Sequence, residues 1–146
     1  MKKYILLTLL VFSFQTIFSQ DDFQKSYSEM LELSENYLNN EEYEAANDVL
    51  CKAINLNNSD PLAYYMRARA IFWGYIGDSP FSLAMSDCQK ALSFLTKKDK
   101  EFKGKIYSLI ANMRVVEDEG DWCKDFKKSC NYNNQDSCKA FDDLCQ

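Results

Sequence analysis

The chain has 146 residues and a formal net charge of −5 at pH 7, and 47% of its residues are hydrophobic. An acidic chain repels nucleic acid and anionic lipid, so we expect neither as a partner. Histidine is absent, which excludes Ser-His and Cys-His catalytic dyads and removes the usual general base near neutral pH. We therefore expect a protein that is not an enzyme.

The first 19 residues have the pattern of a secretory signal peptide. Lys2 and Lys3 form a positive start, an uncharged apolar stretch covers 4–18, and the small residue Ser19 precedes a polar run. Cleavage after Ser19 would remove both lysines, change the net charge from −5 to −7 and leave 20–146 as one domain. We expect bacterial export, a periplasmic or secreted product, and no membrane insertion after cleavage.

A repeat with a period of 38 residues organises the rest of the chain. Three columns of residues keep this spacing: Lys52, Lys90 and Lys128; Leu50, Cys88 and Phe126; and Leu56, Phe94 and Tyr132. Around each column, apolar residues recur at spacings of three and four, as the buried stripe of a helix requires. Each block is therefore predicted to be one amphipathic helix, the second of a helix pair.

The first helix of each pair is predicted to precede this block. The predicted ranges are 23–38, 61–76 and 100–119, within units of about 23–58, 60–96 and 100–132. Asp60 before Pro61, and Ser79 before Pro80, are typical helix starts. Gly77 and Gly120 lie between the helices of the second and third pairs, where glycine supplies the left-handed residue that ends a helix.

Four cysteines near the C-terminus are separated by seven, eight and seven residues. They are Cys123, Cys130, Cys138 and Cys145. Seven residues span two helical turns, so each pair shares one face of a helix, and the asparagine-rich stretch between the pairs can turn the chain. Antiparallel packing of the two helices would then join Cys123 to Cys145 and Cys130 to Cys138. Residues 135–146 would form a capping helix held by these bonds.

Other interpretations of the cysteines are less favoured or remain open. Structural zinc sites prefer two to four residues between ligands, and there is no histidine, so we expect no metal. A redox pair is disfavoured because no Cys-x-x-Cys occurs. Cys88 falls in a core column and Cys51 nearer the surface; they could form a third disulfide or remain two unreactive thiols.

An acidic cluster is the one candidate for acid-base chemistry. Glu117, Asp118, Glu119 and Asp121 are nearly consecutive. Acid-base work needs a carboxylate in a cleft with a shifted pKa, and consecutive charges in a loop give no sign of one. The cluster is therefore interpreted as a solvated helix end and turn.

Helix pairs at this period resemble the tetratricopeptide repeat (TPR) family. The first unit carries the resemblance at Met30, Leu33, Tyr37, Tyr43, Ala46, Leu50, Ala53, Leu56 and Asp60-Pro61. The second carries it at Tyr64, Ala68, Ile71, Phe81, Ala84, Cys88, Ala91 and Phe94, with about four extra residues in its turn. The third is weaker: Tyr107, Ala111 and Gly120-Asp121 match, but Trp122 stands where the family prefers alanine. The spacing of Cys130 and Cys138 also resembles Sel1-like cysteine-rich repeats.

The resemblance implies an all-α fold, a short right-handed α-solenoid of about three TPR-like helix pairs with a C-terminal capping helix. It also implies that the first helices of the pairs line a concave face that binds a peptide of another envelope or secreted protein. Carried over by position, this face comprises Leu31, Glu35, Leu38, Tyr65, Arg69, Phe72, Trp73, Asn112 and Val116. For Phe72 and Trp73 a place in the core is the alternative.

The partner is thus expected to be a protein or peptide, with no cofactor and a monomeric chain. The alternative is a structural or assembly component of an envelope complex without a peptide groove. An exported enzyme is the less favoured third interpretation.

Overall fold

The computed structural model describes residues 24–78 and 80–145, and all regular structure in those ranges is helical, as predicted. The first helix covers residues 24–39. The helices that follow are α2 (Tyr43–Leu56), α3 (Pro61–Gly74), α4 (Pro80–Phe94), α5 (Lys100–Glu117), α6 (Trp122–Asn131) and α7 (Gln135–Leu144). The predicted signal peptide and the predicted helix start at Ser79 lie outside the described residues.

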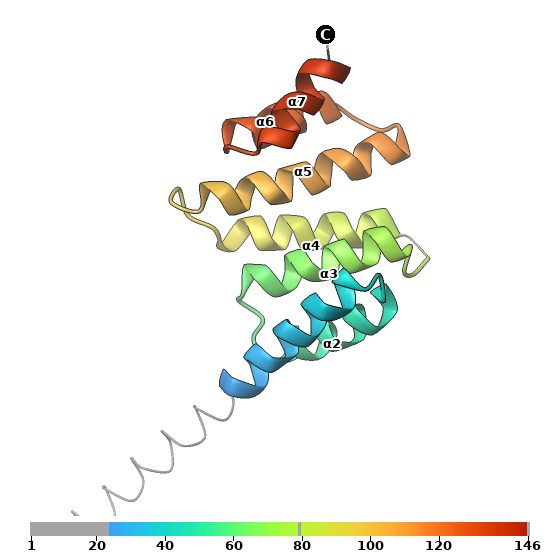
Figure 1. Cartoon of the computed structure of the whole chain (residues 1–146), viewed down its shortest axis with the longest axis vertical. Coiled ribbons are helices and arrows are strands. Elements are labelled where there is room, and N and C mark those ends of the chain that lie inside the picture. The colour runs from blue at the N-terminus through green and yellow to red at the C-terminus, as the bar shows by residue number, and fades with distance from the viewer. Residues whose placement is uncertain (1–23, 79, 146) are drawn as a thin grey trace, which may run out of the picture.

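The helices are stacked in chain order along the long axis of the molecule (Figure 1). From α2 to α7, each helix packs against the next one in the sequence, and α3 also contacts α5. Packing that is confined to near neighbours is the property of a helical solenoid. Within the described part of the chain, no helix combines the length and apolarity that crossing a membrane would require.

The predicted start of α3 is confirmed. Pro61 is its first residue, and the Asp60 carboxylate accepts a hydrogen bond of 2.8 Å from the Leu62 backbone N–H. This bond satisfies one of the backbone donors that a helix leaves unpaired at its first turn. Asp60 also accepts a 2.8 Å hydrogen bond from the Tyr27 hydroxyl, which ties the first helix to the start of α3.

The predicted ends of α3 and α5 are two residues too late. The residues that end them in the left-handed region are Tyr75 and Asp118, both with φ of 52°. Gly77 (φ 90°) and Gly120 (φ 69°) are left-handed, but each lies two residues further along the turn. The same pattern in both turns is consistent with a repeated unit.

Two apolar cores hold the first two helix pairs and α5 together. The smaller one lies between the first helix, α2 and α3 and is formed by Leu38, Ala46, Leu50, Met66 and Ala70. The larger one is built mainly from α3, α4 and α5, with Ile106 and Met113 fully buried. The repeat column of Leu50, Cys88 and Phe126 is buried throughout. The 38-residue period therefore reports one recurring core position.

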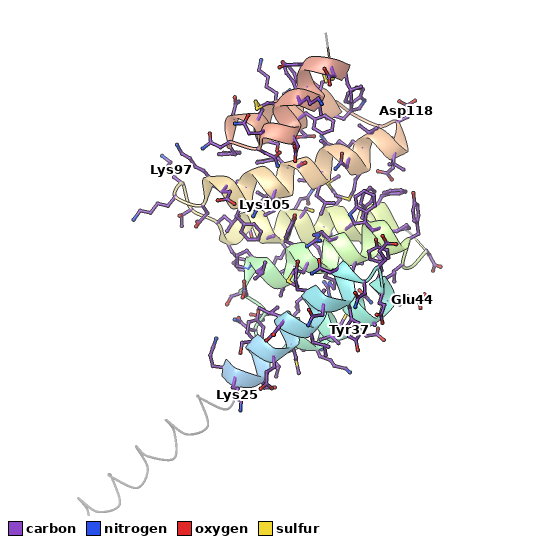
Figure 2. All side chains as sticks on the ribbon, in the orientation of Figure 1. Lys25, Tyr37, Glu44, Lys97, Lys105 and Asp118 are labelled. Atoms are coloured by element: carbon purple, nitrogen blue, oxygen red, sulfur yellow. A yellow bond between two sulfur atoms is a disulfide. The ribbon has the colours of Figure 1, made fainter. Side chains whose placement is uncertain are left out.

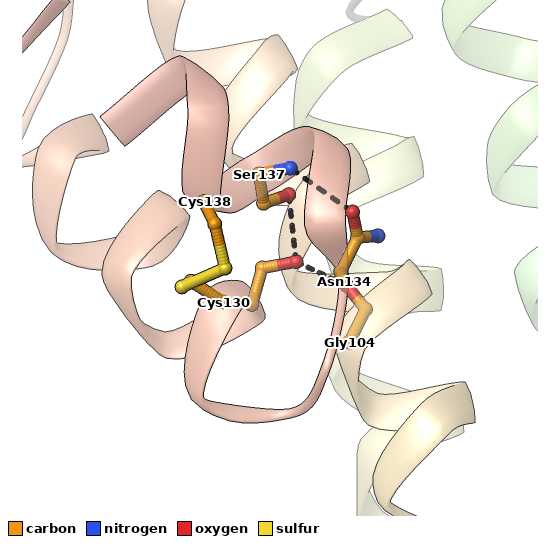
Figure 3. The surroundings of a disulfide bond; sticks show 6 residues. Gly104, Cys130, Asn134, Ser137 and Cys138 are labelled. Atoms are coloured by element: carbon orange, nitrogen blue, oxygen red, sulfur yellow. Dashed lines mark hydrogen bonds between the residues drawn. A yellow bond between two sulfur atoms is a disulfide. The ribbon is translucent and has the colours of Figure 1, made fainter. Parts of the chain in front are cut away.

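The C-terminal hairpin of α6 and α7 is joined by both predicted disulfides, Cys123–Cys145 and Cys130–Cys138. Polar contacts attach the hairpin to α5: the Ser129 hydroxyl donates a 2.7 Å hydrogen bond to the Gly104 carbonyl and shares a 2.8 Å hydrogen bond with Ser137 (Figure 3). Ser137 is the only buried residue of α7. Disulfides and buried hydroxyl groups therefore contribute to holding the hairpin, beside the buried ring of Phe126.

Candidate functional site

Arg69 on α3 connects the helices of the predicted binding face. Its Nη1 lies 3.6 Å from Glu35 Oε1 on the first helix, and its guanidinium carbon lies 5.8 Å from the centroid of the Tyr65 ring. Tyr65 in turn packs edge-on against Phe102 of α5, with ring centroids 5.3 Å apart. We use the name A-helix face for the predicted ligand-binding residues that are not buried: Leu31, Glu35, Tyr65, Arg69, Trp73, Asn112 and Val116.

The exposed apolar groups on this face are Trp73 and Val116. The Trp73 side chain is 51% exposed and Val116 is 52% exposed. Leu31, Tyr65, Arg69 and Asn112 are partly buried. Tyr65, Arg69 and Trp73 follow one another at intervals of four residues, so they lie along one side of α3.

Two of the predicted ligand-binding residues lie in the cores, so their prediction as binding residues is wrong. Leu38 is 5% exposed and belongs to the smaller core, and Phe72 is 2% exposed and belongs to the larger one. For Phe72 the alternative, a core position, is the one observed. Its ring lies 4.6 Å from that of Trp73, measured between centroids, so the buried ring supports the exposed one.

The A-helix face carries nearly balanced charge. Glu35 and Arg69 form an ion pair, which neutralises the positive charge at its centre. Burial raises the pKa of the Tyr65 hydroxyl above its usual value of 10.0, so the phenol stays protonated and can donate a hydrogen bond. The face can therefore offer aromatic surface and hydrogen bonds, with little net attraction for a strongly charged ligand.

A pocket of about 320 Å³ on the other side of α3 was not predicted. Its lining comprises Asn47, Cys51, Arg67, Ile71, Ile76, Gly77, Leu83, Ser86 and Asp87. Arg67 donates two hydrogen bonds of 2.8 Å to the carboxylate of Asp87. This ion pair joins α3 to α4, and it could not be predicted because the two residues are 20 positions apart in the chain.

Cys51 and Cys88 are free thiols, so the third disulfide considered from the sequence does not form. Cys88 is buried, and burial, together with the neighbouring charge of Asp87, raises its pKa well above the usual range. Cys51 is partly exposed, and its sulfur accepts a long hydrogen bond of 3.6 Å from Arg67. Cys88 is therefore the less reactive of the two, because the thiolate is the nucleophile.

The acidic cluster lies at the exposed end of α5, as predicted. Asp118 is at the outer edge of the molecule beyond that helix (Figure 2). Three of the four carboxylates, however, line a pocket of about 490 Å³ together with residues of α4. Among the described residues, no three acidic or cysteine side chains are grouped in a way that could hold a metal ion.

A third pocket, of about 360 Å³, lies beside the start of α2 and is lined by Glu41, Glu42, Tyr43, Glu44, Ala45 and Gly74.

Comparisons with known proteins identify the fold. No family model matches the chain, and no curated protein matches it. A solved structure that is similar is the first TPR of Spaghetti (RPAP3) bound to the HSP90 peptide SRMEEVD. The identity is 21%, the TM-score is 0.68, and the match covers 84% of this chain and 94% of that one. The chain therefore has the all-α, TPR-like helical-repeat fold that its repeat columns predicted.

Proposed function

We propose that the mature chain is an exported interaction module that binds a peptide segment of another envelope or secreted protein on the A-helix face. The observation that carries this proposal is the half-exposed ring of Trp73 in line with Arg69 and Tyr65 on α3. Tyrosine, tryptophan and arginine are the residue types that most often dominate binding energy at protein interfaces. The ring of Phe72 supports Trp73 from the core, so little side-chain freedom is lost on binding.

The similar TPR structure supports a peptide ligand but suggests a different peptide chemistry. The peptide bound to that protein, SRMEEVD, has three acidic side chains and one arginine. On the A-helix face of this chain, Arg69 is already paired with Glu35. We therefore expect a ligand with apolar or aromatic anchors that contact Trp73 and Val116, and not a strongly acidic tail.

The cysteines and the N-terminal sequence support an oxidising compartment as the place where this chain meets its partner. Two disulfides are typical of proteins in an oxidising compartment. Together with the signal pattern of residues 1–19, they favour a periplasmic or secreted protein. The partner would then be an envelope or exported protein in the same compartment.

A peptide selection on the mature, oxidised chain tests the proposal. Peptides from a random displayed library are selected, and their Kd is measured by calorimetry for the wild type and for Trp73→Ala and Arg69→Ala. We expect each variant to weaken binding about 10-fold or more, which corresponds to about 1.4 kcal/mol. The matched control is Leu144→Ala on α7, because Leu144 is similarly exposed, at 58%, but lies away from this face.

Peptide binding that is unchanged in Trp73→Ala and Arg69→Ala would contradict the proposal, provided that circular dichroism shows both variants folded. A selection that yields no peptide dependent on Trp73 would favour the alternative, a structural or assembly role through the outer face of the solenoid. Analytical ultracentrifugation of the same sample would test the expectation of a monomer.

A further inference from the structure

A pocket of about 490 Å³ lies at one end of the helix layers, between α4 and the turn that follows α5. One wall is formed by Phe81, Ser82 and Met85 of α4, and the other by Arg114, Glu117, Glu119, Gly120 and Asp121. The turns that follow α3 and α5 lie on the same side of the molecule (Figure 1). None of these residues belongs to the A-helix face, so the pocket is a separate surface.

The apolar wall of the pocket is aromatic and rigidly supported. The Phe81 ring lies 5.7 Å from the ring of the buried Phe72 and 5.7 Å from that of Tyr75, both measured between centroids. Tyr75 is 60% exposed and packs edge-on against Phe81. Its left-handed backbone, with φ of 52°, is costly for a bulky residue. A partly buried aromatic ring that lines a pocket, with an exposed tyrosine packed against it, provides apolar surface for a partner side chain.

The opposite wall carries negative charge that the protein does not neutralise. Over residues 24–78 and 80–145, no lysine or arginine forms an ion pair with Glu117, Glu119 or Asp121. The one cation in the lining is Arg114, and it is paired with the buried carboxylate of Asp125. Asp121 also accepts a 3.1 Å hydrogen bond from the Lys124 backbone at the start of α6. The pocket therefore offers the carboxylates of Glu117 and Glu119 to a positive group from outside, while that of Asp121 is partly used by the backbone of α6.

The shape and chemistry of the two walls favour an organic cation with an apolar stem. A bare metal ion does not fit, because no three carboxylates in the described part of the chain are grouped to ligate one, and it would not use the aromatic wall. An arginine side chain has a planar cation that stacks on an aromatic ring and pairs with carboxylates. Its aliphatic stem can lie along apolar surface.

We infer that this pocket binds an arginine side chain of a partner protein. The stem lies against Phe81 and Met85, and the guanidinium pairs with Glu117 and Glu119. The acidic cluster is thus a docking element for a basic segment, in addition to ending α5. Peptide binding on the A-helix face does not depend on this contact, so either proposal can fail without the other.

Nuclear magnetic resonance titration of the mature, oxidised, ¹⁵N-labelled chain tests the inference. The probe is Nα-acetyl-arginine N-methylamide, and the control ligand is the citrulline analogue, which has nearly the same shape but no charge. We expect saturable shifts at the amides of Phe81 and Gly120, with a Kd on the order of 1 mM for so small a ligand. The citrulline analogue should bind at least about 5-fold more weakly, and raising the ionic strength from about 0.01 M to about 0.15 M should weaken arginine binding.

Charge-neutral variants locate the site. Glu117→Gln with Glu119→Gln should weaken arginine binding at least about 5-fold, because the shape of the wall is kept and its charge is lost. Asp142→Asn with Asp143→Asn changes the net charge equally on α7 and should leave binding unchanged. The inference is overturned if citrulline binds as well as arginine, if the shifts map elsewhere, if both double variants behave alike, or if no saturable shift occurs up to about 20 mM probe.

Discussion

The first two helix pairs and the C-terminal hairpin are held together by different physical means. In the first two pairs, the buried residues are almost all apolar, and alanines such as Ala46 and Ala84 are completely buried where helices approach. In α6 and α7, the buried residues are Asp125, Phe126, Ser129 and Ser137, and two disulfides join the helices. Disulfides and buried polar groups thus have a larger part in the hairpin than in the first two pairs.

The difference follows from the size of the elements and from their position at the end of the stack. Helices α6 and α7 have 10 residues each, whereas α5 has 18. A helix as short as α7 is not stable alone in water, and with only Ser137 buried it gains little from the hydrophobic effect. Covalent links therefore supply what an apolar core supplies elsewhere.

Removal of both disulfides should cause the largest loss of stability, and the loss should be confined to the hairpin. Replacing the four paired cysteines by serine should cost about 3 kcal/mol for Cys123–Cys145 and about 2.5 kcal/mol for Cys130–Cys138, because their sequence separations are 22 and 8. Hydrogen exchange should show loss of protection in α7, while α2 and α3 stay protected. Retained protection in α7 would mean that the polar contacts alone hold it.

Truncation of Leu50 tests the opposite case, a helix pair that depends on its apolar core. Leu50 is completely buried, so Leu50→Ala should lower the free energy of unfolding by about 3 to 4 kcal/mol in urea denaturation. Leu56→Ala on the same helix is the control, because Leu56 is 40% exposed, and its effect should be below about 1 kcal/mol. Equal losses would show that burial does not determine stability in α2.

A methyl group at Gly104 probes the close contact between α5 and the hairpin. A Cβ there would lie 3.0 Å from the Tyr132 carbonyl oxygen. In an unrestricted helix interior, Gly→Ala stabilises by about 1 kcal/mol; here we expect Gly104→Ala to destabilise by about 1 to 2 kcal/mol. Thermal unfolding measures the change, and Lys105→Ala at the neighbouring exposed position should be nearly neutral. Stabilisation by Gly104→Ala would show that the hairpin can shift.

An effect of similar size to that of Gly104→Ala is expected from the serine pair. Ser129→Ala removes the hydrogen bonds to the Gly104 carbonyl and to the Ser137 hydroxyl. It should lower the free energy of unfolding by about 1 to 2 kcal/mol, because both groups stay buried and lose this partner. Denaturation of Ser129→Ala, Ser137→Ala and the double variant forms a thermodynamic cycle. Additive losses would show that the two hydroxyls act independently.

The sequence predicted the helices because apolar residues recur at helical spacing, and one column of the 38-residue period, Leu50, Cys88 and Phe126, is buried in each unit. Helix ends were less predictable, since Tyr75 and Asp118 adopt a conformation that side chains usually avoid. Leu38 and Phe72 are assigned to the binding face by their positions in the resemblance to the repeat family, and only the packed structure shows that both side chains are covered. The acidic pocket could not be predicted, because its walls come from residues 81–85 and 114–121, which meet only in the folded chain.

The burial of Cys88 has a consequence for oxidative folding. Six thiols can pair completely in 15 ways, but the four thiols of the tail alone have three pairings. Packing of α3, α4 and α5 around Cys88 withdraws one competitor from exchange, and the antiparallel register of α6 and α7 then brings the correct partners together. Formation of the core before oxidation therefore keeps Cys88 out of mispaired bonds, whereas the partly exposed Cys51 can still compete.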